Sequence, residues 1–337
     1  MRLFIGSVLL YVLSLFFTSC SKSDKIIHDE VRNVSISINT ESYNRTKASS
    51  PGSEEAVKNV QVLLFKDERL YGSRASDSPD VEFMVNDGTY DIYVFVNDPK
   101  DWISDAYITK EEITASRSLL SDNSTSSYVM FGYQPSFVVN KNTSNVTIPV
   151  NRFISKVMLE NLRTDFGENP YFKGKALEIK KIYLSNIYGE CPCSMVPDDN
   201  PSADDIWFCR MGTEDIPEHL KPLTSDEGLD IILQDGESEK FSRVYYTYPN
   251  GCISDSSSGS WSPRRTRLVI EAVLDGTKCW YHITLPPMMP NVTYIITSCT
   301  IKNMGGTSPE EHLGPTCEVT ITSSLSWEET YFVEEES

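Results

Sequence analysis

The stretch that decides the fold is LVIEAVLDGTKCWYHITL, residues 268–285. Two alternating apolar runs flank Asp275-Gly276, a dipeptide that favours a two-residue hairpin turn because both positions tolerate positive φ. Such a turn pairs Leu274 with Thr277, Ala272 with Cys279, Ile270 with Tyr281 and Leu268 with Ile283. These side chains share one face, and the other face is mostly polar or amphipathic. Turn geometry and burial pattern therefore agree in predicting an antiparallel hairpin.

Short alternating runs of the same kind recur along the chain, bounded by turn residues, and helical patterns are few. This pattern predicts an all-β, antiparallel protein rather than βαβ units. A helical turn is expected within residues 110–118, and Asn86-Asp87-Gly88 is expected to join its flanking strands as a hairpin. Strands are predicted at residues 34–38, 60–65, 81–85, 89–96, 137–139, 146–150, 153–159, 177–184, 268–274, 277–285, 292–301 and 318–322.

The length of 337 residues favours two domains. The strand pattern restarts at Phe153, so we expect an N-terminal β-sandwich over residues 31–151 and a C-terminal one over residues 152–337. The second contains a long insertion, residues 191–230, which is rich in Pro, Asp and Gly and has little periodicity. Cysteines in this insertion could supply the order that packing does not.

The charge of the chain limits its partners. There are 48 acidic and 30 basic side chains, and the net charge is −18. The electrostatic field of such an acidic chain repels phosphate backbones, which argues against nucleic-acid binding as the main function. The hydrophobic content of 39% is that of a globular protein rather than a disordered tail.

The N-terminus has the features of an export signal. Arg2 is followed by an apolar run over residues 3–17 and by small residues, which predicts a signal peptide over residues 1–19. The segment ending at Cys20 resembles the bacterial lipobox, although Phe17 stands where Leu is usual. We expect Cys20 to carry lipid and residues 20–30 to form a tether to the outer membrane. The alternative is an ordinary secretory peptide, with Cys20 in a disulfide.

Seven further cysteines lie in the C-terminal half, and all are disulfide candidates. They are Cys191, Cys193, Cys209, Cys252, Cys279, Cys299 and Cys317. The number is odd, so at most three disulfides are expected among them, with the pairing open. A zinc site at Cys191, Cys193, Cys209 and His219 is the weaker alternative, because the spacing matches no standard finger and export favours oxidation.

Signatures of catalysis are mostly absent. The sequence has no Gly-x-Ser-x-Gly elbow, no Walker loop and no His-Glu-x-x-His, and its four histidines are isolated. Asp198, Asp199, Asp204 and Asp205 could hold calcium, but their spacing departs from the EF-hand, so a solvated loop is favoured. We therefore predict a protein that is not an enzyme and needs no metal or cofactor. An exported hydrolase with a dispersed acidic site is the weakest alternative.

Aromatic residues make up 11% of the chain, which would suit the stacking of sugars. They support an alternative function, a surface glycan-binding lipoprotein that uses Trp261 or Trp280. A β-sandwich core also uses aromatic residues, so this signal separates the two functions poorly.

Several stretches together resemble one known family. They are the lipobox at Cys20, the strand 60–65 after a polar Arg/Lys loop, GTYDIYVFVN at 88–97, VNRFISKV at 150–157, NVTYII at 291–296 and GGTSP at 305–309. These stretches are similar to the fimbrillin superfamily, the pilus subunits of Bacteroidales. The resemblance implies two transthyretin-like antiparallel β-sandwich domains in tandem. It also implies a role in adhesion, as the stalk, the tip or a lipid-retaining anchor of a fimbrium at the outer membrane.

The resemblance further implies assembly with other fimbrial subunits by strand exchange, in which a protease removes the lipidated N-terminal strand. The removable strand would contain Val34, Ile36 and Ile38, with Arg45 as the cleavage site, because Arg32 precedes the strand and would leave it in place. The vacated groove would accept a strand from a neighbouring subunit. We expect the donor to contain Val319, Ile321, Leu325 and Trp327. The alternative is that this segment is an ordinary edge strand, and any host or bacterial surface ligand stays unknown.

Overall fold

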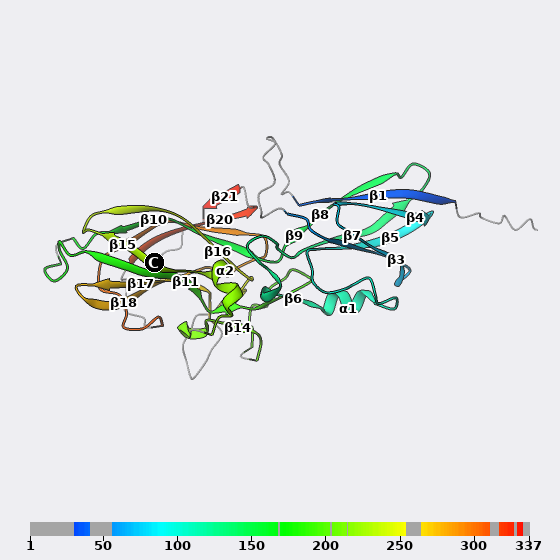
Figure 1. Ribbon diagram of the computed structural model, residues 1–337. Helices are drawn as coiled ribbons and strands as arrows, with labels where there is room; N and C mark the ends of the chain where they lie inside the picture. The colour runs from blue at the N-terminus through cyan, green and yellow to red at the C-terminus, as the bar shows by residue number, and fades with distance from the viewer. Residues whose placement is uncertain are drawn as a thin grey trace, which may run out of the picture.

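The computed structural model describes residues 30–40, 56–167, 169–202, 204–213, 215–253, 264–310, 317–326 and 329–332. The predicted signal peptide, Cys20, Arg45, Trp261 and Trp327 lie outside these residues. The described chain forms two β-sandwiches, in which most strand pairs are antiparallel. The sandwiches follow each other along an elongated molecule (Figure 1). The prediction of an all-β protein with tandem sandwiches is confirmed. No helix in these residues is long and apolar enough to cross a membrane.

The first sandwich has a three-stranded sheet facing a five-stranded one, with strand orders β4-β1-β8 and β3-β2-β5-β7-β9. Their bounds are β1 Val31–Asn39, β2 Val60–Lys66, β3 Arg69–Ser76, β4 Asp80–Asn86, β5 Gly88–Val96, β7 Met130–Val139, β8 Asn145–Pro149 and β9 Asn151–Arg152. Alternating aliphatic side chains from both sheets, such as Ile36 and Ile92, form one buried core between them.

The second sandwich faces a five-stranded sheet, β16-β10-β19-β20-β21, with a four-stranded one, β15-β11-β17-β18. Their bounds are β10 Ser155–Thr164, β11 Leu177–Ser185, β15 Ser225–Leu233, β16 Ser238–Thr247, β17 Arg267–Leu274, β18 Thr277–Thr284, β19 Thr293–Ile301, β20 Cys317–Ser326 and β21 Glu329–Phe332. In Figure 1, β20 and β21 (red) lie along the upper edge of this sandwich.

The two sandwiches have the same topology. In the first, β1 is antiparallel to β4 and parallel to β8. In the second, β10 is antiparallel to β16 and parallel to β19 in the same way. The facing sheets also correspond, because the order β3-β2-β5-β7 matches β15-β11-β17-β18. The second sandwich differs in continuing past β19 to β20 and β21, whereas no described strand lies beyond β8.

The hairpin of β17 and β18 has the predicted register. Leu274 pairs with Thr277, and the pairing continues to Leu268 with Ile283. Asp275 and Gly276 have φ of 49° and 77°, as a turn of this type requires. Seven of the eight side chains on the predicted inward face are buried, and Thr277, next to the turn, is exposed.

The hairpin predicted at Asn86-Asp87-Gly88 is wrong. β4 pairs with β1, whereas β5 pairs with β2 and β7, so the chain crosses from one sheet to the other at Asp87. Phe83 on β4 and Ile92 on β5 consequently face each other across the core. A hairpin would have put both strands side by side in one sheet, whereas the crossing supplies one strand to each layer of the sandwich.

A connecting region joins the two sandwiches. It contains α1 (Lys110–Ala115), capped by Thr109, then β6 (Arg117–Leu119) and η2 (Leu120–Asp122). β6 pairs with β13 (Glu190–Pro192), which belongs to the insertion of the second half. The helical turn predicted within residues 110–118 is thus present.

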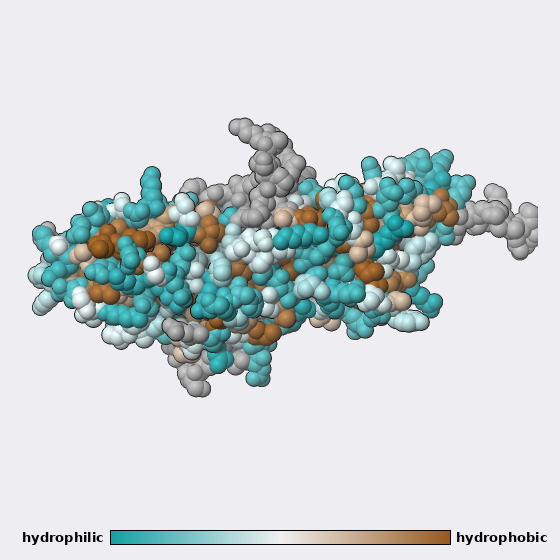
Figure 2. All heavy atoms as spheres, viewed as in Figure 1, coloured by the Kyte–Doolittle hydropathy of each residue, from teal (hydrophilic) through white to brown (hydrophobic). Residues whose placement is uncertain are grey.

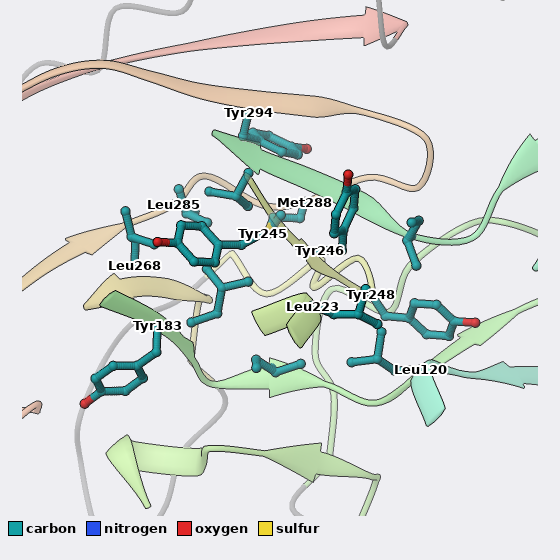
Figure 3. Packing of buried hydrophobic residues seen from close by; sticks show 14 of the residues in the cluster. Leu120, Tyr183, Leu223, Tyr245, Tyr246, Tyr248, Leu268, Leu285, Met288 and Tyr294 are labelled. Carbon is teal, nitrogen blue, oxygen red and sulfur yellow. The ribbon is translucent and has the colours of Figure 1, made fainter. Parts of the chain in front are cut away.

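A buried tyrosine ties this connecting region to the second sandwich. The Tyr248 hydroxyl donates to Leu119 O at 3.0 Å, accepts from Asn123 Nδ2 at 2.9 Å and lies 2.6 Å from Ser118 Oγ. Burial raises the pKa of Tyr248 well above its usual value, so the phenol stays neutral. Figure 3 shows Tyr248 beside Leu120, at the end of the apolar cluster that continues to Tyr245 and Leu285.

The insertion is more ordered than its composition predicts. Residues 225–230, which were expected to belong to it, are the first part of β15. β12 (Ile187–Tyr188) precedes the predicted insertion, and β13 begins one residue before it. The insertion then contains β14 (Trp207–Phe208), η3 (Arg210–Gly212), η4 (Glu218–Leu220) and α2 (Lys221–Thr224). The short pairing of β12 with β14 supplies order that periodicity could not reveal, because two-residue strands have no measurable period.

Candidate functional site

The leading strand β1 is the middle strand of its sheet. It makes ladders with β4 on one side and with β8 on the other, and Ile36 lies opposite Val81 and beside Val146. In Figure 1, β1 (blue) lies in the outer layer of the first sandwich. Removing it would therefore leave a slot with unpaired backbone groups on two edges, rather than a single exposed edge.

The floor of this slot is apolar. Val34, Ile36 and Ile38 of β1 are 2%, 1% and 8% exposed and point into the core. Val34 and Ile36 line a small internal gap together with Leu64, Phe83, Val85, Tyr90, Ile92, Phe137 and Val139. Each fully buried aliphatic side chain contributes about 1.5–3 kcal/mol relative to exposure. An empty slot would thus be strongly unfavourable in water.

The first residues of this strand are held by charge. The Arg32 guanidinium donates to Asp87 Oδ1 at 2.8 Å and also contacts Glu30. Arg32 is itself in the ladder, opposite Val85. Arg32 therefore lies within β1 rather than before it as predicted. Because its backbone is paired, it is a poor protease site, whereas Arg45 lies outside the described residues.

The expected donor segment forms β20 and a following strand, β21. β20 lies between β19 and β21, so it is not the edge strand of the sheet. Val319 and Ile321 are half-buried and pack against the core of the second sandwich. Leu325 lies in β20, but its side chain is outside the described set, as is all of Trp327.

The seven cysteines of the C-terminal half are all within the described residues, and the structure has no disulfide among them. Cys193 Sγ lies 3.1 Å from Ser116 Oγ, and Cys279 Sγ lies 3.6 Å from the Tyr281 hydroxyl. Burial raises the pKa of Cys193 to about 11. The structure brings Cys299 and Cys317 into side-chain contact. Cys191, Cys209 and Cys252 are buried elsewhere in the second half.

The residues considered for metal do not assemble. In the described ranges, no group of three or more His, Cys, Asp or Glu side chains is placed to hold an ion. Asp198 and Asp205 instead accept hydrogen bonds from the backbone N–H groups of Asn200 and Ser202 within their own loop. The acidic loop is organised by these short-range bonds.

A hollow of about 550 Å³ lies on the outer face of the β15-β11-β17-β18 sheet. Trp280 and Tyr183 are on its sheet side, and Figure 3 shows the Tyr183 ring pointing away from the other labelled side chains of the apolar cluster. Gly212, Thr213 and Pro309 also line it, and Gly212 lies against Pro309. The backbone of Trp280 is paired with Gly306, and a Cβ on Gly305 would lie 2.5 Å from Trp280 O, so this close wall requires glycine.

Four lysines line the hollow, and each of them is paired with a carboxylate. Its lining includes Lys180, Lys181, Lys221 and Lys278 but only two carboxylates, Glu227 and Glu271. Lys181 pairs with Glu227, Lys278 with Glu271 and Lys221 with Glu218, each at 2.8 Å. Lys180 pairs with Glu178 at 3.1 Å. On the face seen in Figure 2, apolar residues form small separate groups on a mainly hydrophilic surface. Glu271, Lys278 and Trp280 lie on the hairpin face that the sequence predicts to be mostly polar or amphipathic. No sequence pattern predicted the residues that form the walls.

Taken together, these features define a class: a tandem β-sandwich protein with a slot-filling first strand and an additional C-terminal strand pair. The sequence matches no protein-family model and no curated protein sequence.

Solved structures of cell-surface proteins share the fold. A candidate cell adhesion protein from Parabacteroides distasonis has a TM-score of 0.62 at 14% identity, covering 88% of this chain and 96% of its own. A fimbrilin, FimA, from Porphyromonas gingivalis has a TM-score of 0.57 at 13% identity, covering 91% and 99%. The tip fimbrial protein Mfa3 of the same organism, truncated at its C-terminus, has a TM-score of 0.53 at 10% identity, covering 87% and 99%. The resemblance to fimbrillins is confirmed at the level of the fold.

Proposed function

We propose that this protein is a non-enzymatic structural subunit of a cell-surface fimbrium that serves adhesion. It is exported as a lipoprotein, with Cys20 carrying the lipid and residues 20–30 the tether, and processing at Arg45 releases it for assembly. The fold shared with FimA and Mfa3 supports this role. Stalk and tip positions both require the cut, whereas an anchor would keep its lipid and escape cleavage.

The observation that carries the proposal is the position of β1. This strand fills an apolar slot with Val34, Ile36 and Ile38, yet it precedes every other described strand and is joined to β2 through residues 40–59. A single cut at Arg45 would separate it without interrupting another described strand. A strand held only by noncovalent contacts can be replaced by another strand with the same alternation.

The repeated topology supports β20 and β21 as the donor. Every strand from β10 to β19 that forms the core of the second sandwich has a counterpart in the first, whereas β20 and β21 have none among the described strands. The core can thus close without them. Val319 and Ile321 have the two-residue spacing of Val34 and Ile36, so they can enter the same positions of a slot.

A locked first strand tests this proposal. Asn33 lies opposite Met84 on the exposed side of β1 and β4, so Asn33→Cys with Met84→Cys can form a cross-strand disulfide. After cleavage at Arg45 we expect the locked protein to stay monomeric and to polymerise when reductant is added. Asn33→Cys alone is the matched control and should polymerise at once. Polymerisation of the locked protein before reduction would refute strand departure.

The hollow beside Trp280 favours a second candidate function, binding of a carboxylated surface glycan. An indole face beside several ammonium groups suits a sugar ring that carries an acid. Four lysines gather here although the chain has a net charge of −18, and an acidic sugar would compete with the carboxylates that pair with them. Fimbrial assembly and glycan binding are compatible, since the hollow lies on the second sandwich and the slot on the first.

Calorimetry with a galacturonic acid tetramer tests this second function. We expect binding that falls about tenfold in Trp280→Ala and is lost when the tetramer is methyl-esterified. Trp207→Ala is the matched control, because Trp207 is not among the residues that line the hollow. Equal binding by both variants would exclude the hollow as the site.

A further inference from the structure

Cys299 and Cys317 lie on neighbouring antiparallel strands. In the ladder of β19 and β20, Ile301 is opposite Cys317 and Cys299 is opposite Val319. The two cysteines are therefore diagonal neighbours whose side chains point to the same face of the sheet. Their side chains are hydrogen-bonded to each other. Closing a disulfide from this contact needs side-chain rotation until the sulfurs are about 2.0 Å apart.

The environment of the pair suits a structural disulfide. Cys299 is 1% exposed, whereas Cys317 is only partly buried and can be reached from solvent. Contact with Cys317 and then burial raise the pKa of Cys299 well above its usual value, which disfavours its thiolate. An external oxidant would therefore react first at Cys317, and the buried sulfur would then close the bond.

We propose that Cys299 and Cys317 form a disulfide in the exported protein. The oxidant is the active-site disulfide of a thiol–disulfide oxidoreductase in the exporting compartment. The Cys317 thiolate attacks that disulfide to give a mixed disulfide, and Cys299 displaces the enzyme. Two thiols lose two protons and two electrons in forming one S–S bond, and the oxidoreductase is reduced to its dithiol.

If β20 is the donor strand, the disulfide would anchor the donor to its own subunit. This role of the disulfide rests on the proposed function. Cys317 is the first residue of β20, and pairing with β19 runs from Cys317 to Ser324. The disulfide would hold the start of the strand on its own subunit while the rest separates from β19. Residues 318–332, fully extended, would still span about 50 Å at about 3.3 Å per residue.

Peptide mapping of the uncleaved monomer tests the disulfide without requiring polymerisation. The protein is exported in its native host, blocked with N-ethylmaleimide at lysis and digested without reductant. Trypsin leaves Cys279 and Cys299 together in residues 279–302 and Cys317 in residues 303–337. We expect a disulfide to link these two peptides. The Cys279→Ser variant should keep this disulfide, and the Cys299→Ser variant should lose it. Linkage lost in Cys279→Ser, or alkylated Cys299 and Cys317, would overturn the pairing.

A stability measurement provides the second readout. A disulfide between Cys299 and Cys317 closes the loop between them and so constrains the unfolded chain. Cys317→Ser should therefore raise the unfolding equilibrium constant of the second sandwich about 100-fold. Reductant should reproduce that shift in the wild type and leave Cys317→Ser unchanged. A reductant effect of equal size in Cys317→Ser would show that another bond is responsible. A correct disulfide with no polymerisation would refute the donor role alone.

Discussion

Cleavage after Arg45 is expected to convert the monomeric protein into a ladder of oligomers that withstands mild heating in detergent. The cut frees β1 from covalent attachment, after which noncovalent contacts hold it: its two ladders, three buried aliphatic side chains, the Arg32–Asp87 ion pair and the Ser37–Asp80 hydrogen bond. An incoming strand from a second copy replaces those contacts. Because that strand remains part of a folded subunit, each exchange adds one protein to the chain.

The measurement uses an arginine-specific protease, N-terminal sequencing and unboiled detergent gels. A new N-terminus at Thr46 should appear together with the ladder. Arg45→Ala should remain uncut and monomeric. Arg32→Ala is the informative control, since Arg32 lies within the paired strand, and it should still be cut and polymerise. A protein that stays monomeric after a verified cut at Arg45 would count heavily against strand exchange.

The sequence predicted strand pairing correctly where the turn residues and the alternation of the flanking strands indicated the same register. In the hairpin of β17 and β18, the Asp275-Gly276 turn and the alternation of both arms specify one register, and the structure has that register. At Asn86-Asp87-Gly88 the signals were similar, yet β4 and β5 lie in different sheets. Whether consecutive strands pair or face each other depends on β1 and β2, which occupy the neighbouring positions, and no local pattern contains that information.

The candidate sites were likewise predicted only as far as local pattern determines them. Alternation alone indicates that Val34, Ile36 and Ile38 share a buried face, because a strand has a period of two. It could not show that β1 is a middle strand, since β8 is more than a hundred residues away along the chain. The contact of Cys299 with Cys317 likewise depends on the register between β19 and β20, which the intervening residues 302–316 leave undetermined in sequence.

Removal of residues 318–337 is expected to abolish the oligomer ladder while leaving an intact acceptor slot. The truncation keeps Cys317 and all strands from β1 to β19, and it removes the half-buried Val319 and Ile321. Loss of their contacts should destabilise the second sandwich by a few kcal/mol at most. A gentler variant, Ile321→Asp, keeps the strand but puts a charge where the slot is apolar, and it should also block assembly.

Mixing distinguishes a lost donor from a misfolded subunit. If the proposal is correct, the truncated protein cut at Arg45 has a slot and no donor, whereas uncut full-length Arg45→Ala has a donor and a filled slot. Together they should form a heterodimer and no longer oligomer, because neither partner can extend the chain. Thr320→Asp is the matched control for Ile321→Asp, since Thr320 is exposed on the other face of β20, and it should polymerise. If the cut, truncated protein formed the full ladder on its own, the donor would have to lie elsewhere in the chain.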